Sequence, residues 1–243
     1  AADAVLTQRV KNAPPERKNL FVQRLQGFGA TLQDQYDSTD SGVFNRDLSG
    51  LLHSGDRRWT FPSRQEMAAG TLNDLRGQIG PALTGGPVEV VIVGDVTVEQ
   101  AIQITAATFG ALPARPDPAP PSPPASTTAF PPPAAQPVVL THRGRADQAV
   151  GYIAWPTGDF FTSPQRARDI SVTSRVLQLR LLDLLREQEG ATYSPNTGNT
   201  ASFVFGGYGY VSASVEMPPA RMEGFFSDVS RIAADLRDHE ITA

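Results

Sequence analysis

The sequence has no cysteine and only three histidines in 243 residues. The absence of cysteine excludes disulfide bonds, thiolate metal sites, iron–sulfur clusters and thiol nucleophiles. His53, His142 and His239 lie too far apart to form an H-x-x-x-H or H-x-x-E-H motif, which would hold zinc from a single helix. The chain therefore lacks the usual zinc-hydrolase motifs, and a functional interpretation has to explain this shortage.

The chain also has no large excess of positive or negative charge and no long apolar run. The 21 basic and 25 acidic residues give a net charge of −4, which argues against a nucleic-acid partner. No run of about 18 apolar residues occurs, so we expect no membrane span. Residues 1–20 do not have the basic-then-apolar pattern of a signal peptide. We expect either no signal peptide or one on another part of a longer polypeptide.

Proline is abundant and unevenly distributed. Eleven of the 21 prolines fall between Pro113 and Pro137. Such a stretch favours extended polyproline conformations and predicts neither helix nor central strand. We interpret it as a surface connector between two folded parts; a recruitment site for a proline-binding module is the alternative. We therefore expect a helical or irregular segment over residues 1–62 and a domain over 63–243 that contains the connector 113–137.

The remaining elements follow from hydrophobic periodicity and from helix-start signals. Before the connector we expect helices over 15–27, 63–80 and 98–109, an irregular segment over 34–50 and a buried strand over 88–93. After it we expect strands over 138–142 and 148–155, a helix over 164–189, a hairpin of strands 192–203 and 207–216, and a final helix from Pro218. This order predicts an α+β fold of two layers, a mainly antiparallel sheet with helices packed on one face.

Two glycine-containing segments could mark ligand sites. Gly94-Asp95 follows the expected buried strand and precedes a helix, which is where a phosphate-binding turn would lie. The glycine patterns of dinucleotide and P-loop sites are missing there, so a structural turn is the favoured interpretation. The glycine-rich residues 206–210 lie in a strand context and favour a bulge or a close approach of sheet and helix over ligand contact.

The segment over residues 184–194 is the remaining candidate for chemistry. Arg186 lies in the last turn of an expected helix, and Tyr193 lies just past the glycine stop at Gly190. Together they would offer a cation and a phenolic donor to an anionic group or to a carbonyl oxygen that gains negative charge. An arginine at a helix C-terminus is also explained by the helix dipole alone.

This segment reads L-R-E-x-x-G-x-x-Y-S and resembles a signature of the non-catalytic halves of pitrilysin/insulinase-type zinc peptidases, a family that includes the mitochondrial processing peptidase. The resemblance extends over roughly residues 63–240. It includes the apolar segment 90–95, which ends in Gly-Asp, the Phe-Gly-x-Leu-Pro segment within 108–113, and residues 179–181. The sequence looks most like bacterial, envelope-associated members.

The resemblance implies a metal-free half of a two-half enzyme. Active halves of the family carry H-x-x-E-H, which is absent here, so zinc and the general-base glutamate are expected on a partner domain or subunit. The residues that match the family's auxiliary arginine and tyrosine are Arg186 and Tyr193, with roles in anchoring a peptide substrate and stabilising the tetrahedral intermediate. No cofactor is expected on this chain itself, and the location implied is the bacterial periplasm or cell envelope.

The sequence also departs from the family pattern and leaves alternatives open. Ser171-Val-Thr-Ser174 replaces a glycine-rich turn that often precedes the long helix, and the ending after His239 favours a piece of a longer protein. One alternative is a purely structural relative, like core subunits of respiratory complexes, in which Arg186 and Tyr193 only support a helix end and a strand. Another is a stand-alone peptide-binding module that uses an exposed strand edge.

Overall fold

The computed structural model describes residues 14–115, 120, 122–134, 136–189 and 195–239. Contacts within the chain divide it into two compact units. Unit 1 takes in residues 1–31 and 63–121, and unit 2 takes in residues 32–62 and 122–243. Helix α2 (Pro15–Asp37) is shared between them. No helix in the described ranges is long and apolar enough to cross a membrane.

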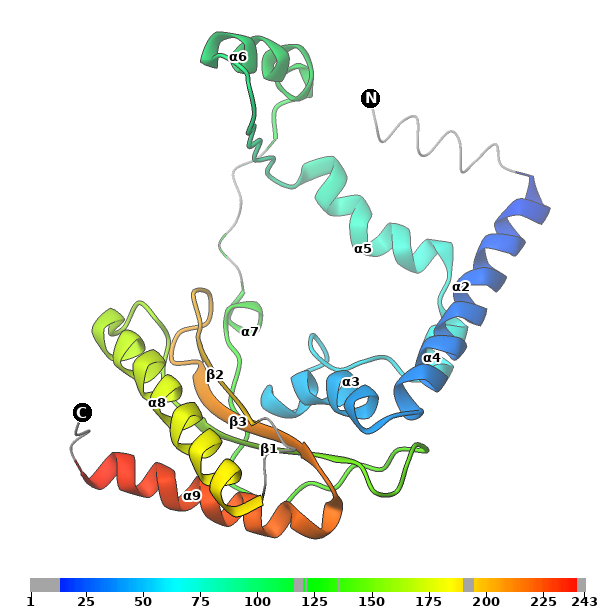
Figure 1. The fold of residues 1–243 in the computed structure, drawn as a ribbon. Coiled ribbons are helices and arrows are strands. Elements are labelled where there is room, and N and C mark those ends of the chain that lie inside the picture. The colour runs from blue at the N-terminus through cyan, green and yellow to red at the C-terminus, as the bar shows by residue number, and fades with distance from the viewer. Residues whose placement is uncertain (1–13, 116–119, 121, 135, 190–194, 240–243) are drawn as a thin grey trace. The chain divides into compact units, whose positions relative to one another are not determined.

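The centre of unit 2 is a three-stranded antiparallel sheet in the order β1-β3-β2 (Figure 1). The strands are β1 (Ala149–Pro156), β2 (Asn196–Ala201) and β3 (Gly209–Met217). The register places Gly151 opposite Val215 and Thr197 opposite Ala213. The sequence prediction of a strand near 148–155 and of a following hairpin is confirmed.

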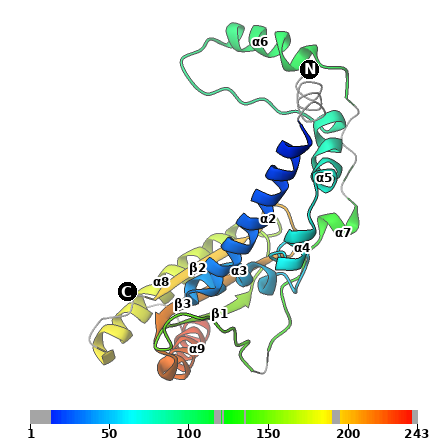
Figure 2. The ribbon, with the colours of Figure 1, turned by 90° about the vertical axis from the view of Figure 1, so that its right-hand side faces the viewer.

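Two helices cover one face of this sheet. The helix α8 (Pro164–Glu189) runs alongside β2, and α9 (Met222–Asp238) follows the short 3-10 helix η2 (Pro219–Arg221) (Figure 2). Arg180 of α8 and Asp235 of α9 form an ion pair at the helix contact. The buried core lies between these helices and β3 and consists of Leu177, Leu181, Leu185, Ala213, Val215, Met217, Phe225, Val229 and Ile232. The α+β class with helices packed against an antiparallel sheet is therefore confirmed.

The opposite face of the sheet meets α3 (Asp40–Leu52). Gly151 of β1 faces the helix α9, because a Cβ atom there would meet Met222 and Phe225. Strand side chains alternate, so the next residue, Tyr152, points to the opposite face, where its ring centroid lies 5.4 Å from that of Phe44. The expectation of an irregular segment over 34–50 is wrong, because α2 and α3 occupy it. Thr39 caps α3 by accepting a hydrogen bond from the Gly42 amide.

The second half of the proline-rich stretch is held on unit 2. Arg58 donates to the Ala125 carbonyl at 2.9 Å, and Ser54 donates to the Ala129 carbonyl at 3.1 Å. The expectation of no helix there is wrong for one turn, α7 (Pro123–Ser126). Proline is compatible with the first turn because the amide that it lacks would have no partner there.

Unit 1 consists of helices with local caps. It holds the first part of α2, then α4 (Arg64–Ala69), α5 (Leu72–Gly85), α6 (Val98–Ala107) and the 3-10 helix η1 (Phe109–Ala111). The expected single helix over 63–80 is wrong in two respects. A second capping box at Thr71 and Asp74 starts a new helix, and α5 continues through Pro81. The predicted helix start at residue 98 is confirmed, and Thr97 caps α6 by accepting a hydrogen bond from the Gln100 amide.

Two predicted strands are not formed. Residues 88–93 form neither helix nor strand and have no strand partner within the described ranges, and Val93 is 92% exposed. Residues 138–142 likewise pair with no strand among the described residues, and Val138, Val139 and Leu140 are exposed. An apolar, β-branched run is not sufficient for a strand, because a neighbouring strand is needed to satisfy the backbone hydrogen-bonding groups.

Candidate functional site

Of the two residues predicted to carry chemistry, Arg186 lies within a described element, α8. Arg186 is in the last turn of this helix, which ends at Glu189 as the sequence predicted. Tyr193 lies outside the described residues. The juxtaposition of the two side chains is therefore still a prediction.

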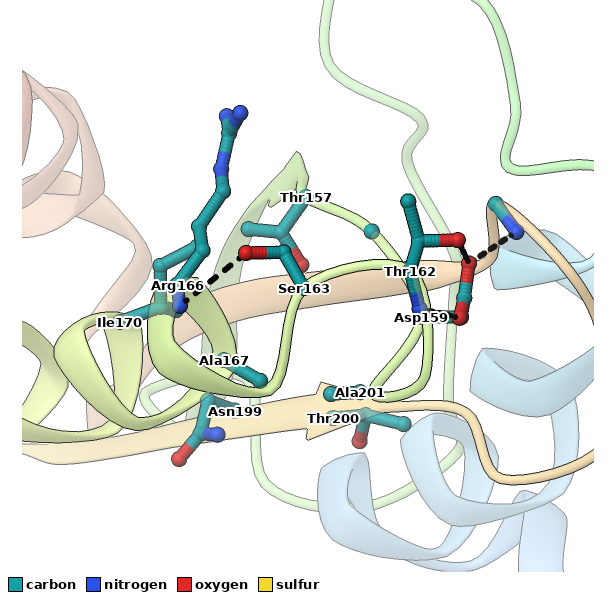
Figure 3. A pocket seen from close by; sticks show the side chains of 12 residues that line it. Thr157, Asp159, Thr162, Ser163, Arg166, Ala167, Ile170, Asn199, Thr200 and Ala201 are labelled. Carbon is teal, nitrogen blue, oxygen red and sulfur yellow. Dashed lines mark hydrogen bonds between the residues drawn. The ribbon is translucent and has the colours of Figure 1, made fainter.

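A cavity of about 270 Å³ lies at the other end of α8 (Figure 3). Side chains of Ser163 and Arg166 flank it from the start of α8, and Asn199 and Thr200 of β2 lie opposite them. The wall is completed by Thr157, Gly158, Asp159, Thr162, Ala167, Ile170, Ala201 and Gly207. From Arg166 to Arg186 the helix rises about 30 Å, at 1.5 Å per residue. The cavity and Arg186 thus lie at opposite ends of one helix.

Asp159 joins the two loops that form this cavity. Its carboxylate accepts hydrogen bonds from the Gly207 amide at 2.7 Å and from the Thr162 hydroxyl and amide at 2.7 and 2.8 Å. These donors, the Gly207 amide first, lower the pKa of Asp159 from 3.8 to about 2. The carboxylate is consequently charged at neutral pH and fixes the loop after β1 against the turn between β2 and β3.

Gly209 lets the same two segments approach closely. A Cβ atom on Gly209 would lie 2.2 Å from the Gly158 carbonyl oxygen and 2.7 Å from that of Thr200. The Thr157 amide donates to the Gly209 carbonyl at 2.8 Å, so the approach is fixed by a hydrogen bond. The sequence favoured a bulge or a close approach of sheet and helix for residues 206–210; the structure instead brings Gly209 against the loop after β1.

The Gly94-Asp95 turn, unlike Gly209, has no other segment of the described ranges packed closely against its glycine. Gly94 has a φ of 155°, a conformation that side-chain-bearing residues rarely adopt, and a Cβ there would meet open space. Val96 donates to the Gly94 carbonyl at 3.0 Å. These observations favour the structural turn that the sequence analysis preferred.

Metal ligands do not gather anywhere in the part of the chain that the structure describes. No group of three or more histidine, cysteine, aspartate or glutamate side chains there could hold a metal ion. His53 stacks on Trp59 at 4.1 Å, His142 accepts from the Gly144 amide, and His239 lies beside Asp235. The three histidines are therefore engaged in separate local contacts, and a zinc ion has no fitting set of donors here.

The chemistry available in the cavity is binding chemistry. Its wall presents hydroxyl groups, one amide, one guanidinium and the carboxylate of Asp159, and Ser163 has no histidine among the lining residues that could act as a base. The Ser163 hydroxyl instead accepts from the Arg166 amide at 3.4 Å. The arrangement can donate hydrogen bonds to a ligand, but it does not form a nucleophile–base pair.

Sequence reasoning missed this cavity. The available signal was Asp159, which precedes Thr162 by three residues in a loop, a spacing at which aspartate commonly bonds its own backbone. The contribution of Gly207 could not be read in the same way, because it lies 48 residues away in the sequence. Long-range hydrogen bonds of this kind leave no local pattern.

Comparison with known proteins identifies the family. A family model described as "Peptidase M16 inactive domain" matches residues 71–243, which is more than half of the chain. No curated protein sequence matches significantly. The matched region includes α5, α6, all three strands, α8 and α9. The chain therefore belongs to the pitrilysin/insulinase-type M16 peptidase family, and residues 71–243 are its non-catalytic, inactive-type domain.

Proposed function

We propose that this chain is the metal-free half of a two-half zinc peptidase, and that it completes a substrate-binding chamber together with a catalytic H-x-x-E-H half. The observation that carries the proposal is the match of residues 71–243 to the inactive domain of the family. The absence of a fitting set of zinc donors among the described residues is consistent with it. Zinc and the general base are accordingly assigned to the partner half.

In this proposal Arg186 and Tyr193 are the residues of this chain that meet the substrate. A guanidinium suits a peptide carbonyl or carboxylate because it presents several donors in a fixed plane. A phenol can donate a hydrogen bond to the oxygen that gains charge in a tetrahedral intermediate. Arg186 belongs to the last turn of α8, which extends to Glu189, and its reach toward the substrate is part of the proposal.

The test uses the complete enzyme with its catalytic half and a fluorogenic peptide substrate. We expect Arg186→Ala and Tyr193→Phe each to lower kcat/KM by about 10²–10³-fold, the usual loss when one stabilising donor is removed from a transition state. The zinc content, measured by inductively coupled plasma mass spectrometry, should not change. Arg175→Ala is the matched control, because Arg175 is an exposed arginine on the same helix.

Near-normal kcat/KM in both variants would refute the assigned roles. That result, with a normal chamber partner, would favour the purely structural relative. Loss of zinc in either variant would also contradict the proposal, because neither side chain is assigned to the metal. An H-x-x-E-H sequence in the parent polypeptide or in a co-purifying subunit is the accompanying expectation.

A further inference from the structure

Three phenylalanine rings form an exposed cluster beside the α8 cavity. We call Phe160, Phe161 and Phe203 the aromatic platform. The ring centroids of Phe160 and Phe203 lie 4.7 Å apart, and Phe161 packs edge-on at 5.7 Å from Phe160 and 5.8 Å from Phe203. Phe161 is 67% exposed and Phe203 is 64% exposed. Such a contiguous exposed apolar patch is typical of an interaction site.

The platform is held rigidly although it is exposed. The Phe160 amide donates to the Ser202 carbonyl at 3.0 Å, and the Ser202 hydroxyl accepts from the amides of Val204 and Phe205. Asp159 links the same two loops through Gly207. The rings are therefore presented by a hydrogen-bonded scaffold, which reduces the entropy that a ligand would lose on binding.

Positive charge adjoins the platform. The Arg168 guanidinium lies 6.0 Å from the Phe160 ring centroid, and Arg166 lines the neighbouring cavity. Figure 3 shows the Arg166 side chain extending away from the carboxylate of Asp159. Within the described residues neither arginine forms an ion pair, whereas nearby Asp169 accepts a hydrogen bond from Gln165. The charged Asp159 carboxylate also lines this cavity, but its oxygens already accept hydrogen bonds from Gly207 and Thr162. The two guanidinium groups are therefore the charged groups left to meet a partner, and they favour one of negative charge.

We propose that the aromatic platform and the adjoining cavity bind an extended peptide segment of another polypeptide, one that carries an aromatic or large apolar side chain next to acidic side chains. The apolar side chain would stack on Phe161 and Phe203, which removes their faces from water. The acidic side chain would reach Arg166 or Arg168 and form a charge-assisted hydrogen bond. This surface lies about 30 Å along α8 from Arg186, so it goes beyond the proposed chamber role.

Fluorescence anisotropy with the 243-residue chain tests the proposal. The probe is a fluorescein-labelled decapeptide with one phenylalanine between two aspartates in a glycine–serine background. We expect Phe161→Ser and Phe203→Ser each to weaken binding about tenfold, because each removes an aromatic contact as well as buried area. Val172→Ser is the matched control: Val172 is 61% exposed on α8 and lies outside the platform, so binding should not change.

Charge is tested separately. A peptide with lysines in place of the aspartates should bind at least about tenfold more weakly, and Arg166→Gln combined with Arg168→Gln should abolish that preference. Arg175→Gln provides the charge control on the same helix. Because all these side chains are exposed or half-buried, circular dichroism should show an unchanged fold in each variant.

Several outcomes would overturn the proposal. Equal binding of the aspartate and lysine peptides would show that the arginines do not select the partner. Phe161-dependent binding to vesicles of anionic phospholipid, without peptide binding, would assign the platform to a lipid surface. Phe161-dependent self-association in sedimentation experiments would assign it to a second copy of this chain. None of these results depends on Arg186 or Tyr193, so they are separable from a failure of the proposed function.

Discussion

Two valine-containing segments of this chain, residues 211–217 and 88–93, have opposite surroundings. Residues 211–217 lie in β3, between β1 and β2, and Val215 is part of the core. Residues 88–93 have a more apolar sequence but no strand partner in the described ranges, and Val93 is 92% exposed. The difference teaches that an apolar run supplies strand propensity, whereas pairing with a neighbouring strand makes the strand.

The helices of the two units also differ in whether they are packed against other elements. In unit 2, α8 and α9 bury an apolar stripe against the sheet. In unit 1, α4, α5 and α6 each begin with a capping box, and none of their residues is buried. Unit 2 is therefore stabilised by long-range packing, and the described helices of unit 1 by local hydrogen bonds worth about 1 kcal/mol per cap.

Leucine truncation in each unit should show the largest contrast. Leu181 of α8 is 0% exposed, whereas Leu75 of α5 is 46% exposed. Leu181→Ala should lower the free energy of unfolding by about 2–5 kcal/mol because it leaves a cavity in the core. Leu75→Ala should change it by less than about 0.5 kcal/mol. Urea unfolding of both variants measures the difference, and equal losses would mean that unit 1 buries Leu75 in solution.

Replacing one glycine by alanine in each unit should change the free energy of unfolding by smaller amounts and in opposite directions. Gly209→Ala places a Cβ 2.2 Å from the Gly158 carbonyl, so we expect a loss of about 1–3 kcal/mol through backbone displacement. Gly77→Ala in α5 meets no atom within 4 Å and should stabilise that helix by about 0.5–1 kcal/mol. Denaturant midpoints of the two variants provide the check. A neutral Gly209→Ala would contradict the close approach of hairpin and loop.

Most of unit 2 could be predicted from the sequence because its signals are local and its packing agrees with them. Ser163-Pro164 starts α8, and the stripe containing Leu177, Leu181 and Leu185 faces the core as the periodicity predicted. The α3 segment was missed because it is polar, and its helix depends on the Thr39 cap and on contacts with the sheet. The strands at 88–93 and 138–142 were predicted from propensity alone.

The candidate site was less predictable than the fold. Arg186 and Tyr193 came from a resemblance between motifs, and the family match supports the type of domain without testing their roles. Asp159 joins residues that are 48 positions apart, and the aromatic platform brings Phe203 onto Phe160 and Phe161. Such groupings depend on the tertiary approach of two loops, which single-sequence patterns do not encode.

The pH dependence of stability should reveal the smallest contrast. The pKa of Asp159 is about 2 in the folded chain, below its ordinary value of 3.8, so folding favours the charged carboxylate. Its contribution is complete well above about pH 4 and is lost as the pH falls through 4 toward 2. Asp159→Asn should therefore flatten the acid branch of the stability curve of unit 2, measured by urea unfolding at closely spaced pH values.

Asp74 supplies the matched control in unit 1. Its pKa is also lowered, by the hydroxyl and amide of Thr71, but it only caps the exposed helix α5. Asp74→Asn should leave the acid branch of the main unfolding transition unchanged, because that transition reports the core of unit 2. An unchanged branch in Asp159→Asn would mean that Gly207 and Thr162 do not hold the charged carboxylate in solution. An altered branch in Asp74→Asn would mean that the α5 cap is coupled to the core, and the division into locally and globally stabilised units would fail.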